Sequence, residues 1–276
     1  MESHEAIPKH RTPVCYYITV HGLGHATRST ELIRTLLISG RFSVSVVSHV
    51  KKDFFLDCLK DFQIGVQDST TGEMIFSYYD RNLDTGAVQA DVFVVDAKET
   101  LAKYYNTIHL NRESLLSSEA EWLRERGIKL VLVDAIPLAC VAGTMAGATT
   151  VLVSNFSWDF CFKEMLAKLS DGCFIDPNTI IRYKAMVQQC EKDTSSCTFY
   201  MRLPGATPLP TDFPQQKALF GPLIARQPRN FDIRKVFGVP DTTKVLLLGF
   251  GGHSATWQLS DHFLPEGWLC WVLGKY

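Results

Sequence analysis

Short apolar runs alternate along the chain with longer segments whose apolar residues recur every three or four positions. Residues 14–20 form the first run, which is rich in β-branched and aromatic residues and ends at a glycine turn. After Gly24 the apolar spacing becomes helical, and Gly40 suits the end of that helix. The helix face is marked by Leu32, Ile33, Leu36 and Leu37. The pattern predicts a buried parallel strand that leads directly into a helix.

The same alternation continues along most of the chain. Further strands are expected over residues 42–50, 74–79, 129–133, 149–153 and 244–248. Helices are expected over residues 51–60, 98–126 (with a break near His109), 138–146, 160–169 and 178–189. Because strands alternate with helices, the pattern predicts a parallel sheet with right-handed crossovers. The expected fold class is therefore α/β, with a Rossmann-like parallel sheet.

The chain is expected to divide into unequal parts. Residues 1–12 are polar and predict a flexible tail, and residues 13–225 contain the alternating elements of a first Rossmann-like domain. Residues 226–240 are interpreted as a linker. Residues 241–276 then repeat the beginning of the first domain, a strand followed by a glycine turn. We expect this second Rossmann-like domain to be incomplete.

Composition narrows the class of protein. The chain is 46% hydrophobic and 21% charged, which is typical of a soluble globular protein. A net charge of −1 without a basic block argues against nucleic acid as a partner. No apolar run approaches the roughly 18 residues of a transmembrane segment, and the N-terminus lacks a secretory signal. The eight cysteines are scattered without Cys-x-x-Cys spacing, so we expect no metal site and a cytoplasmic location.

The first glycine turn is a candidate substrate-binding element. Gly22 and Gly24 would let a ligand approach the backbone, and the free N–H groups of the following helix favour an anion such as diphosphate. Arg28 could pair with a phosphate or a carboxylate. Alternatively, the glycines only form a tight turn and Arg28 is a solvated surface residue.

Two familiar cofactor motifs do not fit this turn. Thr27 stands where a dinucleotide-binding fingerprint has its third glycine, and Ser48 and His49 stand where it has an acid. A nucleotide-triphosphate loop is absent as well, so no cofactor is expected. The second turn, with Gly251, Gly252 and His253, is interpreted as a further substrate-binding element or as a structural turn.

Two histidines and an aspartate are the candidate catalytic residues. His21 and His25 follow the first strand, and an ordinary imidazole pKa near 6.5 suits a general base. Either histidine could instead bond the turn backbone. Asp134 ends an apolar strand, where it could bond a sugar hydroxyl, orient a catalytic histidine or cap the next helix.

The end of the next strand has the composition of a sugar-binding site. Aromatic and short polar side chains follow one another at Asn155, Phe156, Trp158 and Asp159. Aromatic faces stack on the apolar faces of sugars, and amides bond their hydroxyl groups. Phe156 and Trp158 could equally belong to the core. No Asp-x-Asp occurs, so a metal-bound diphosphate is not indicated.

Seven motifs match, in order, those of a known family. The matching segments are 21–28 (HGLGHATR), 84–91 (DTGAVQAD), 133–137 (VDAIP), 155–160 (NFSWDF), 202–205 (RLPG), 249–252 (GFGG) and 264–270 (LPEGWLC). Together they resemble the glycosyltransferase-like N-terminal region of L-arabinokinase-type proteins, which itself is similar to GT-B glycosyltransferases. The resemblance covers roughly residues 13–276.

The resemblance implies a GT-B type fold with two facing Rossmann-like domains. In such enzymes the N-terminal domain takes the acceptor and the C-terminal domain binds most of the nucleotide-sugar. A histidine after the first strand is the base in many of them, and His25 matches that position best. The chain departs from the family in two respects: it has no GHMP-type kinase domain, and most of its donor half is missing. Either the gene model is truncated or a partner domain supplies the remainder.

The expected function is metal-independent glycosyl transfer from a nucleotide-sugar to a hydroxyl group of a small molecule or glycan, if a second domain completes the site. The alternative is a non-catalytic sugar- or nucleotide-binding module, or a truncated fragment of an L-arabinokinase-like protein.

Overall fold

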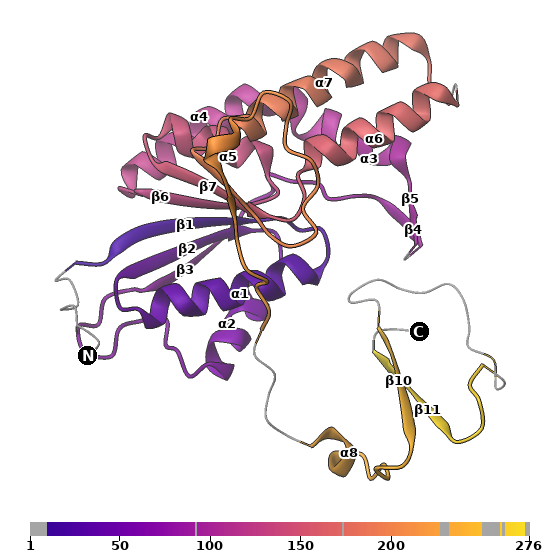
Figure 1. The fold of residues 1–276 in the computed structure, drawn as a ribbon. Coiled ribbons are helices and arrows are strands. Elements are labelled where there is room, and N and C mark those ends of the chain that lie inside the picture. The colour runs from indigo at the N-terminus through magenta and orange to yellow at the C-terminus, as the bar shows by residue number, and fades with distance from the viewer. Residues whose placement is uncertain are drawn as a thin grey trace.

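The computed structural model describes residues 10–91, 93–172, 174–226, 232–249, 260 and 263–273. Seven parallel strands form one sheet in the order β3-β2-β1-β6-β7-β8-β9 (Figure 1). These strands are β1 (Thr12–Ile18), β2 (Phe42–Ser48), β3 (Phe76–Asp80), β6 (Leu130–Asp134), β7 (Thr149–Ser154), β8 (Phe199–Arg202) and β9 (Ala218–Phe220). The strand order reverses between β1 and β6, and in open α/β sheets ligands bind at such a reversal.

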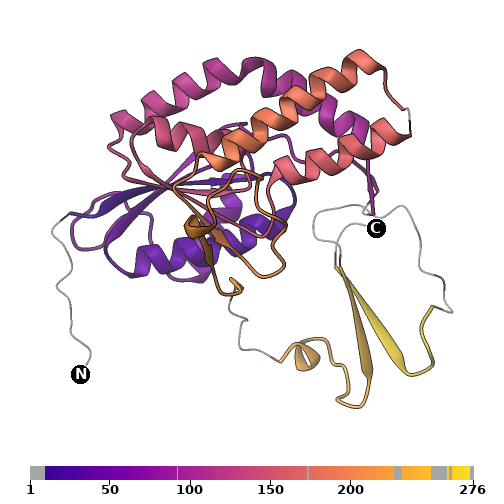
Figure 2. The same cartoon turned by 45° about the horizontal axis from the view of Figure 1, so that its top comes forward.

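Helices cover both faces of this sheet, as Figures 1 and 2 show. One face packs against α1 (Leu23–Ile38) and α2 (Lys52–Asp61). The other face packs against α3 (Ala97–Thr107), α4 (Arg112–Glu125), α5 (Pro137–Met145), α6 (Trp158–Asp171) and α7 (Pro177–Ser195). Residues 10–226 therefore form three layers around the parallel sheet that the alternating pattern predicts.

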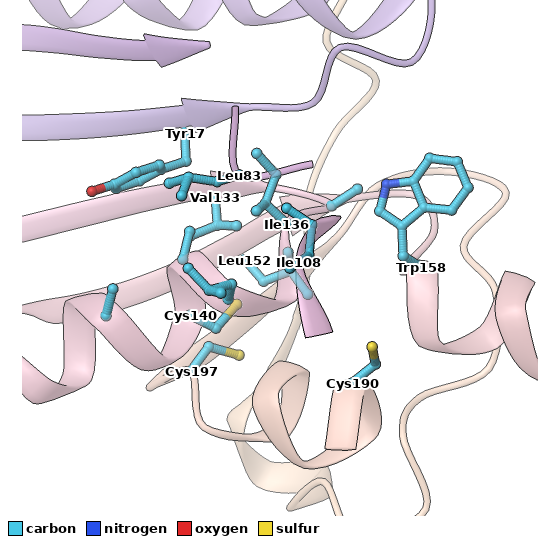
Figure 3. Packing of buried hydrophobic residues seen from close by; sticks show 14 of the residues in the cluster. Tyr17, Leu83, Ile108, Val133, Ile136, Cys140, Leu152, Trp158, Cys190 and Cys197 are labelled. Carbon is cyan, nitrogen blue, oxygen red and sulfur yellow. The ribbon is translucent and has the colours of Figure 1, made fainter. Parts of the chain in front are cut away.

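Strand β1 shows why both faces are apolar. Successive side chains of a strand point to opposite faces of a sheet. Tyr16 packs with Ile33 of α1 in one core cluster, whereas Tyr17 packs with Leu138 of α5 in the other. Figure 3 shows this second cluster, where Tyr17, Val133 and Trp158 are labelled. Burial on both sides explains the continuous apolar run of residues 14–20.

The predicted helices and longer strands are confirmed, and several short elements were missed. The expected break near His109 is a 3-10 turn, η1 (His109–Asn111), between α3 and α4. The missed strands are β4 (Gln89–Asp91), β5 (Val94–Val95), β8, β9 and, near the end of the described chain, β11 (Trp268–Leu273). The first four have four residues or fewer, which is too short for a clear period. A second 3-10 turn, η2 (Gln215–Lys217), precedes β9.

The described residues beyond 232 form a smaller unit. It contains α8 (Ile233–Val236) and two parallel strands, β10 (Lys244–Gly249) and β11 (Trp268–Leu273). Lys244 pairs with Trp268 and Gly249 with Leu273. The strand expected over residues 244–248 is thus confirmed. Among the described helices, none is both long and apolar enough to cross a membrane.

Candidate functional site

The first glycine turn lies at the carboxyl end of β1, beside the reversal in strand order. Gly22 is the N-cap of α1, with φ 73° and ψ 157°. Only glycine adopts this region of backbone space readily. Gly24 differs, because it already lies within α1 and a Cβ added to it would meet no atom within 4 Å. The turn therefore requires glycine at position 22 and not at position 24.

This difference makes a testable pair of variants. Gly22→Ala should lower the free energy of unfolding by about 1–3 kcal/mol, because alanine is strained in that conformation. Gly24→Ala should raise it by about 0.5–1 kcal/mol, because alanine is the better helix residue. Urea denaturation of both variants measures the difference. Equal effects at the two positions would show that the turn is not held as described.

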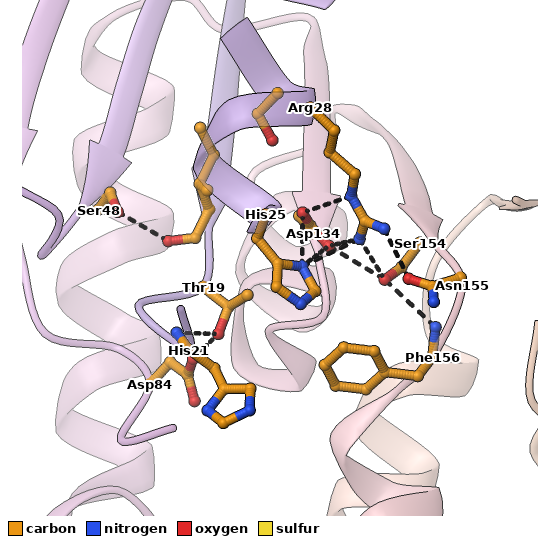
Figure 4. A network of polar contacts seen from close by, with 12 residues as sticks. Thr19, His21, His25, Arg28, Ser48, Asp84, Asp134, Ser154, Asn155 and Phe156 are labelled. Carbon is orange, nitrogen blue, oxygen red and sulfur yellow. Dashed lines mark hydrogen bonds and ion pairs between the residues drawn. The ribbon is translucent and has the colours of Figure 1, made fainter. Parts of the chain in front are cut away.

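His25, Arg28 and Asp134 form one network of polar contacts (Figure 4). The Nδ1 atom of His25 lies 3.0 Å from both carboxylate oxygens of Asp134. Arg28 donates from Nε to Oδ2 of Asp134 at 3.2 Å and from Nη2 to Oδ1 at 2.5 Å. Ser154 donates to Oδ1 of Asp134 at 3.0 Å. The network joins α1, β6 and β7, three elements far apart in the sequence.

The available protons determine which nitrogen of His25 carries hydrogen. Arg28 Nη2 has two N–H groups, and they are used by Asp134 at 2.5 Å and by Ser154 Oγ at 3.0 Å. It therefore has none for His25 Nδ1, which lies 3.0 Å away. The Nδ1–H of His25 must donate to Asp134, because the carboxylate can only accept. In the neutral ring, Nε2 then carries the lone pair that a general base needs.

Asp134 is held as a buried carboxylate. Its side chain is 0% exposed. Burial by itself raises the pKa of this group, but the hydrogen bonds and charges of His25 and Arg28 outweigh that effect and lower the pKa overall. Asp134 therefore stays ionised and fixes the ring orientation and tautomer of His25.

The helix-cap alternative for Asp134 is wrong. The N-cap of α5 is Ile136, and no side chain caps that helix end. Between them, Ala135 has φ 61°, a left-handed conformation that is uncommon for alanine. The chain therefore turns sharply just after Asp134, whose carboxylate contacts α1. Of the three roles considered for Asp134, the geometry agrees with the orientation of a histidine.

The ring nitrogens of His21 are protonated in the opposite way to those of His25. The backbone N–H of Ala87 donates to His21 Nδ1 at 3.2 Å, so the neutral ring carries its proton on Nε2. This contact comes from a loop anchored by Asp84, which accepts hydrogen bonds from the Thr19 hydroxyl and from the Gly86 N–H. His21 thus bonds a backbone group, but one of the loop over residues 84–87 and not of the glycine turn itself, and its Nδ1 atom is occupied as an acceptor.

Asp84 was not identified from the sequence as a site residue. It is 4% exposed, and burial raises its pKa, although the hydrogen bonds from Thr19 and Gly86 act in the opposite direction. The sequence feature that could have revealed Asp84 is the turn over residues 84–86, which lies within one of the matching family motifs. Ser154 was also missed, although it directly precedes Asn155.

The polar residues after β7 separate into two groups. Asn155 accepts from Arg28 Nη1 at 2.6 Å and so belongs to the network. Phe156 lies edge-on to the His25 ring, with the centroids 5.0 Å apart. Asp159 is elsewhere: it is 4% exposed and accepts from Thr194 of α7 at 2.7 Å. Asp159 therefore does not join His25.

Trp158 lies between the site and the core. It is 2% exposed and stacks on Phe162, with the ring centroids 5.4 Å apart. It also packs edge-on against His21 at 5.1 Å. Because almost none of its ring is exposed, Trp158 in this conformation supports the site from behind. A stacking platform for a sugar would need an exposed face.

The role expected for Arg28 also needs correction. Its guanidinium binds a carboxylate of the protein itself, Asp134, together with Asn155 and Ser154. These contacts use four of the five N–H groups. Arg28 therefore organises the network, and little of it is left for a substrate phosphate.

A polar pocket of about 430 Å³ opens beside the turn. Its walls include His21 and Gly22 from the turn, residues 84–87 from the anchored loop and Lys103 from α3. It lies at the carboxyl ends of β1, β2 and β3, where open α/β sheets bind ligands. Gly251, Gly252 and His253 lie outside the described residues. Within the described residues, no cluster of histidine, cysteine and acidic side chains could hold a metal ion.

Comparisons with known proteins agree with the motifs. No protein-family model matches the chain. L-arabinokinase of Arabidopsis thaliana is 34% identical over 261 residues, which is 94% of this chain. The chain is similar to L-arabinokinase. It spans 23% of the length of that relative, so the similarity concerns a segment of the longer protein. The predicted resemblance to an L-arabinokinase-type protein is confirmed.

Solved structures agree with the predicted fold. The glycotransferase of kitacinnamycin superposes with a TM-score of 0.52 at 16% identity, covering 87% of this chain and 57% of that one. Phytolacca americana UGT2 superposes with a TM-score of 0.50 at 12% identity, covering 98% and 72% of the two chains. At such identities the likeness concerns the fold alone. The α/β fold of GT-B type is confirmed.

Proposed function

We propose that the first Rossmann-like domain carries the acceptor side of a glycosyl-transfer site in which His25 is the general base. The observation that carries this proposal is the pair His25–Asp134, in which Nδ1 faces a buried carboxylate and leaves Nε2 to accept a proton. The pair lies at the carboxyl edge of a GT-B type sheet, beside a glycine turn. This is the position at which such a fold binds substrates.

The proposed reaction transfers a glycosyl group to a hydroxyl. His25 Nε2 takes the proton of the acceptor hydroxyl as its oxygen attacks the anomeric carbon. The bond from that carbon to the diphosphate breaks, and the diphosphate leaves with the electron pair. Asp134 stabilises the imidazolium that forms. The first turn of α1, which has no capping side chain, offers N–H groups to the negative charge of the leaving group.

The donor in this proposal is a nucleotide-sugar. Phytolacca americana UGT2 was solved with UDP-2fluoro-glucose and pterostilbene, and we infer by analogy of fold that this chain takes a nucleotide-sugar. We propose the division already expected from the sequence: a tail (1–12), an acceptor-side domain (13–225), a linker (226–240) and a donor-side unit from 241.

A location in the cytoplasm is part of the same proposal. The cysteines within the described part of the chain are all free. Free thiols at Cys15, Cys140 and Cys190 are buried in the core. This usage suits a reducing compartment.

A binding module without catalysis is the second candidate. Two observations favour it. Arg28 shares the carboxylate of Asp134 and so weakens its support for a cationic His25. In addition, L-arabinokinase is named as a kinase, and the segment of it that resembles this chain is 23% of its length. Such a module would bind a sugar or nucleotide-sugar without releasing a product.

A transfer assay with both Rossmann-like halves of the cleft present distinguishes the two candidates. A panel of nucleotide-sugars and hydroxyl acceptors is screened for release of nucleoside diphosphate. Release that depends on the acceptor supports transfer. Calorimetric binding of a sugar or nucleotide-sugar without release supports the binding module.

A further inference from the structure

The polar pocket beside His21 has an unbalanced charge. Lys103 of α3 is exposed and lines the pocket. Its ammonium group donates to the carbonyl oxygen of Thr85 at 3.4 Å, which is a long and weak contact. Among the described residues Lys103 has no carboxylate partner. A cation at the wall of a pocket is therefore available to a ligand.

Asp84, the acidic residue in the same wall, forms no ion pair with Lys103. Asp84 lines the pocket but is 4% exposed. Its oxygens accept from the Thr19 hydroxyl and the Gly86 N–H, so they are directed into the protein. The same environment raises the pKa of Asp84, chiefly through burial, which disfavours its charged form. The exposed part of the pocket is left with positive charge.

The remaining wall suits a hydroxylated ligand. Asn82 and Gln89 supply amide groups, each of which donates and accepts hydrogen bonds. His49 lies at the rim, where its Nδ1 atom is 2.7 Å from a carboxylate oxygen of Asp80. The volume of about 430 Å³ is within the range of small-molecule sites. Amides together with one cation are the groups that recognise a sugar bearing an anionic substituent.

We infer that this pocket binds an acceptor sugar that carries a phosphate or carboxylate group, which pairs with Lys103. The inference rests on the proposed function, because it names the class of acceptor that the same site would take. Lys103 acts here in binding and specificity. His25 belongs to the adjoining turn and does not line this pocket, and it stays the proposed base for the reacting hydroxyl.

Binding of matched sugars to the full chain tests the inference. The probes are glucose and galactose, their uronic acids, and their 1- and 6-phosphates, titrated calorimetrically up to millimolar concentration. At least one anionic sugar should bind about 10-fold more tightly than its neutral parent. The uronate and phosphate arms distinguish the two anions. Equal affinity of all anionic and neutral sugars, or no binding of any anionic sugar, would overturn the inference.

Variants on a single helix supply the control. Lys103→Met keeps the aliphatic stem and should remove the roughly 10-fold preference, whereas Lys103→Arg should retain most of it. Lys98→Met makes the same charge change on α3, at an exposed residue outside this pocket wall, and should leave the preference unchanged. An equal loss in Lys98→Met would assign the effect to overall charge and overturn the inference.

The outcome is separable from that of the proposed function. Binding of an anionic sugar that depends on Lys103, without any glycosyl transfer, would uphold the pocket and reject catalysis. A transfer rate that depends on His25 but is the same for anionic and neutral acceptors would support catalysis and reject the role of Lys103.

Discussion

Replacing His25 with alanine should lower the rate of glycosyl transfer by about 10²- to 10⁴-fold, the usual contribution of a positioned general base. The physical reason is the loss of the Nε2 lone pair, which Asp134 leaves unprotonated by holding the proton on Nδ1. The measurement is the rate of nucleoside diphosphate release, with both halves of the cleft present and substrates saturating. Circular dichroism should show an unchanged fold.

His21→Ala is the matched control on the same turn. Its Nδ1 atom is used by the N–H of Ala87, so we expect a smaller loss of rate than in His25→Ala. A larger loss in His21→Ala would reverse the assignment. Unchanged rates in both variants would reject a histidine base altogether.

Removing the charge of Asp134 should be strongly destabilising. Asp134→Asn leaves Arg28 without its carboxylate in a site where the aspartate is 0% exposed, and breaking a buried pair costs about 3–5 kcal/mol. The amide nitrogen of asparagine would also face donors from Arg28 or His25. Urea denaturation at pH 7 measures the loss.

Asp159→Asn provides the comparison at a second buried aspartate. Asp159 is 4% exposed and accepts from Thr194, but burial raises its pKa. Its charge therefore costs stability instead of adding to it, and we expect a change within about 1 kcal/mol. Equal losses in Asp134→Asn and Asp159→Asn would contradict the special role of the network.

As the pH falls, the free energy of unfolding of the wild type should decrease relative to Asp134→Asn and increase relative to Asp159→Asn. The pKa of Asp134 is lowered in the fold, so its contribution is present above the ordinary value of 3.8 and is lost as the pH falls below it. The stability gap between the wild type and Asp134→Asn should narrow there. The pKa of Asp159 is raised, so the wild type should gain stability relative to Asp159→Asn as the pH falls toward 3.8.

The sequence predicts the fold well because β1 and its neighbours are buried on both faces. That burial requires continuous apolar runs such as residues 14–20, and helices between them show a clear period. The strands β8 and β9 escape prediction because their pairing with the sheet edge, rather than their own residues, makes them strands.

The site is predictable in its residues but less so in their roles. His25, Arg28, Asp134 and Asn155 all stand out at strand ends, but their partners do not. Arg28 and Asp134 are 106 residues apart, and no local pattern reveals that their charges meet. Likewise, the tautomers of His21 and His25 depend on Ala87 and Asp134, which only the fold brings near.

The proton positions on these two histidines decide whether His25 can act as the general base. Long-range ¹H–¹⁵N correlation spectra of the full chain, recorded above pH 8 where unperturbed imidazoles are neutral, distinguish protonated from unprotonated ring nitrogens. We predict a proton on Nδ1 and a lone pair on Nε2 for His25, and the reverse for His21. Asp134→Asn should disturb the pattern of His25 alone. A proton on Nε2 of His25 in the wild-type protein would contradict its assignment as the general base.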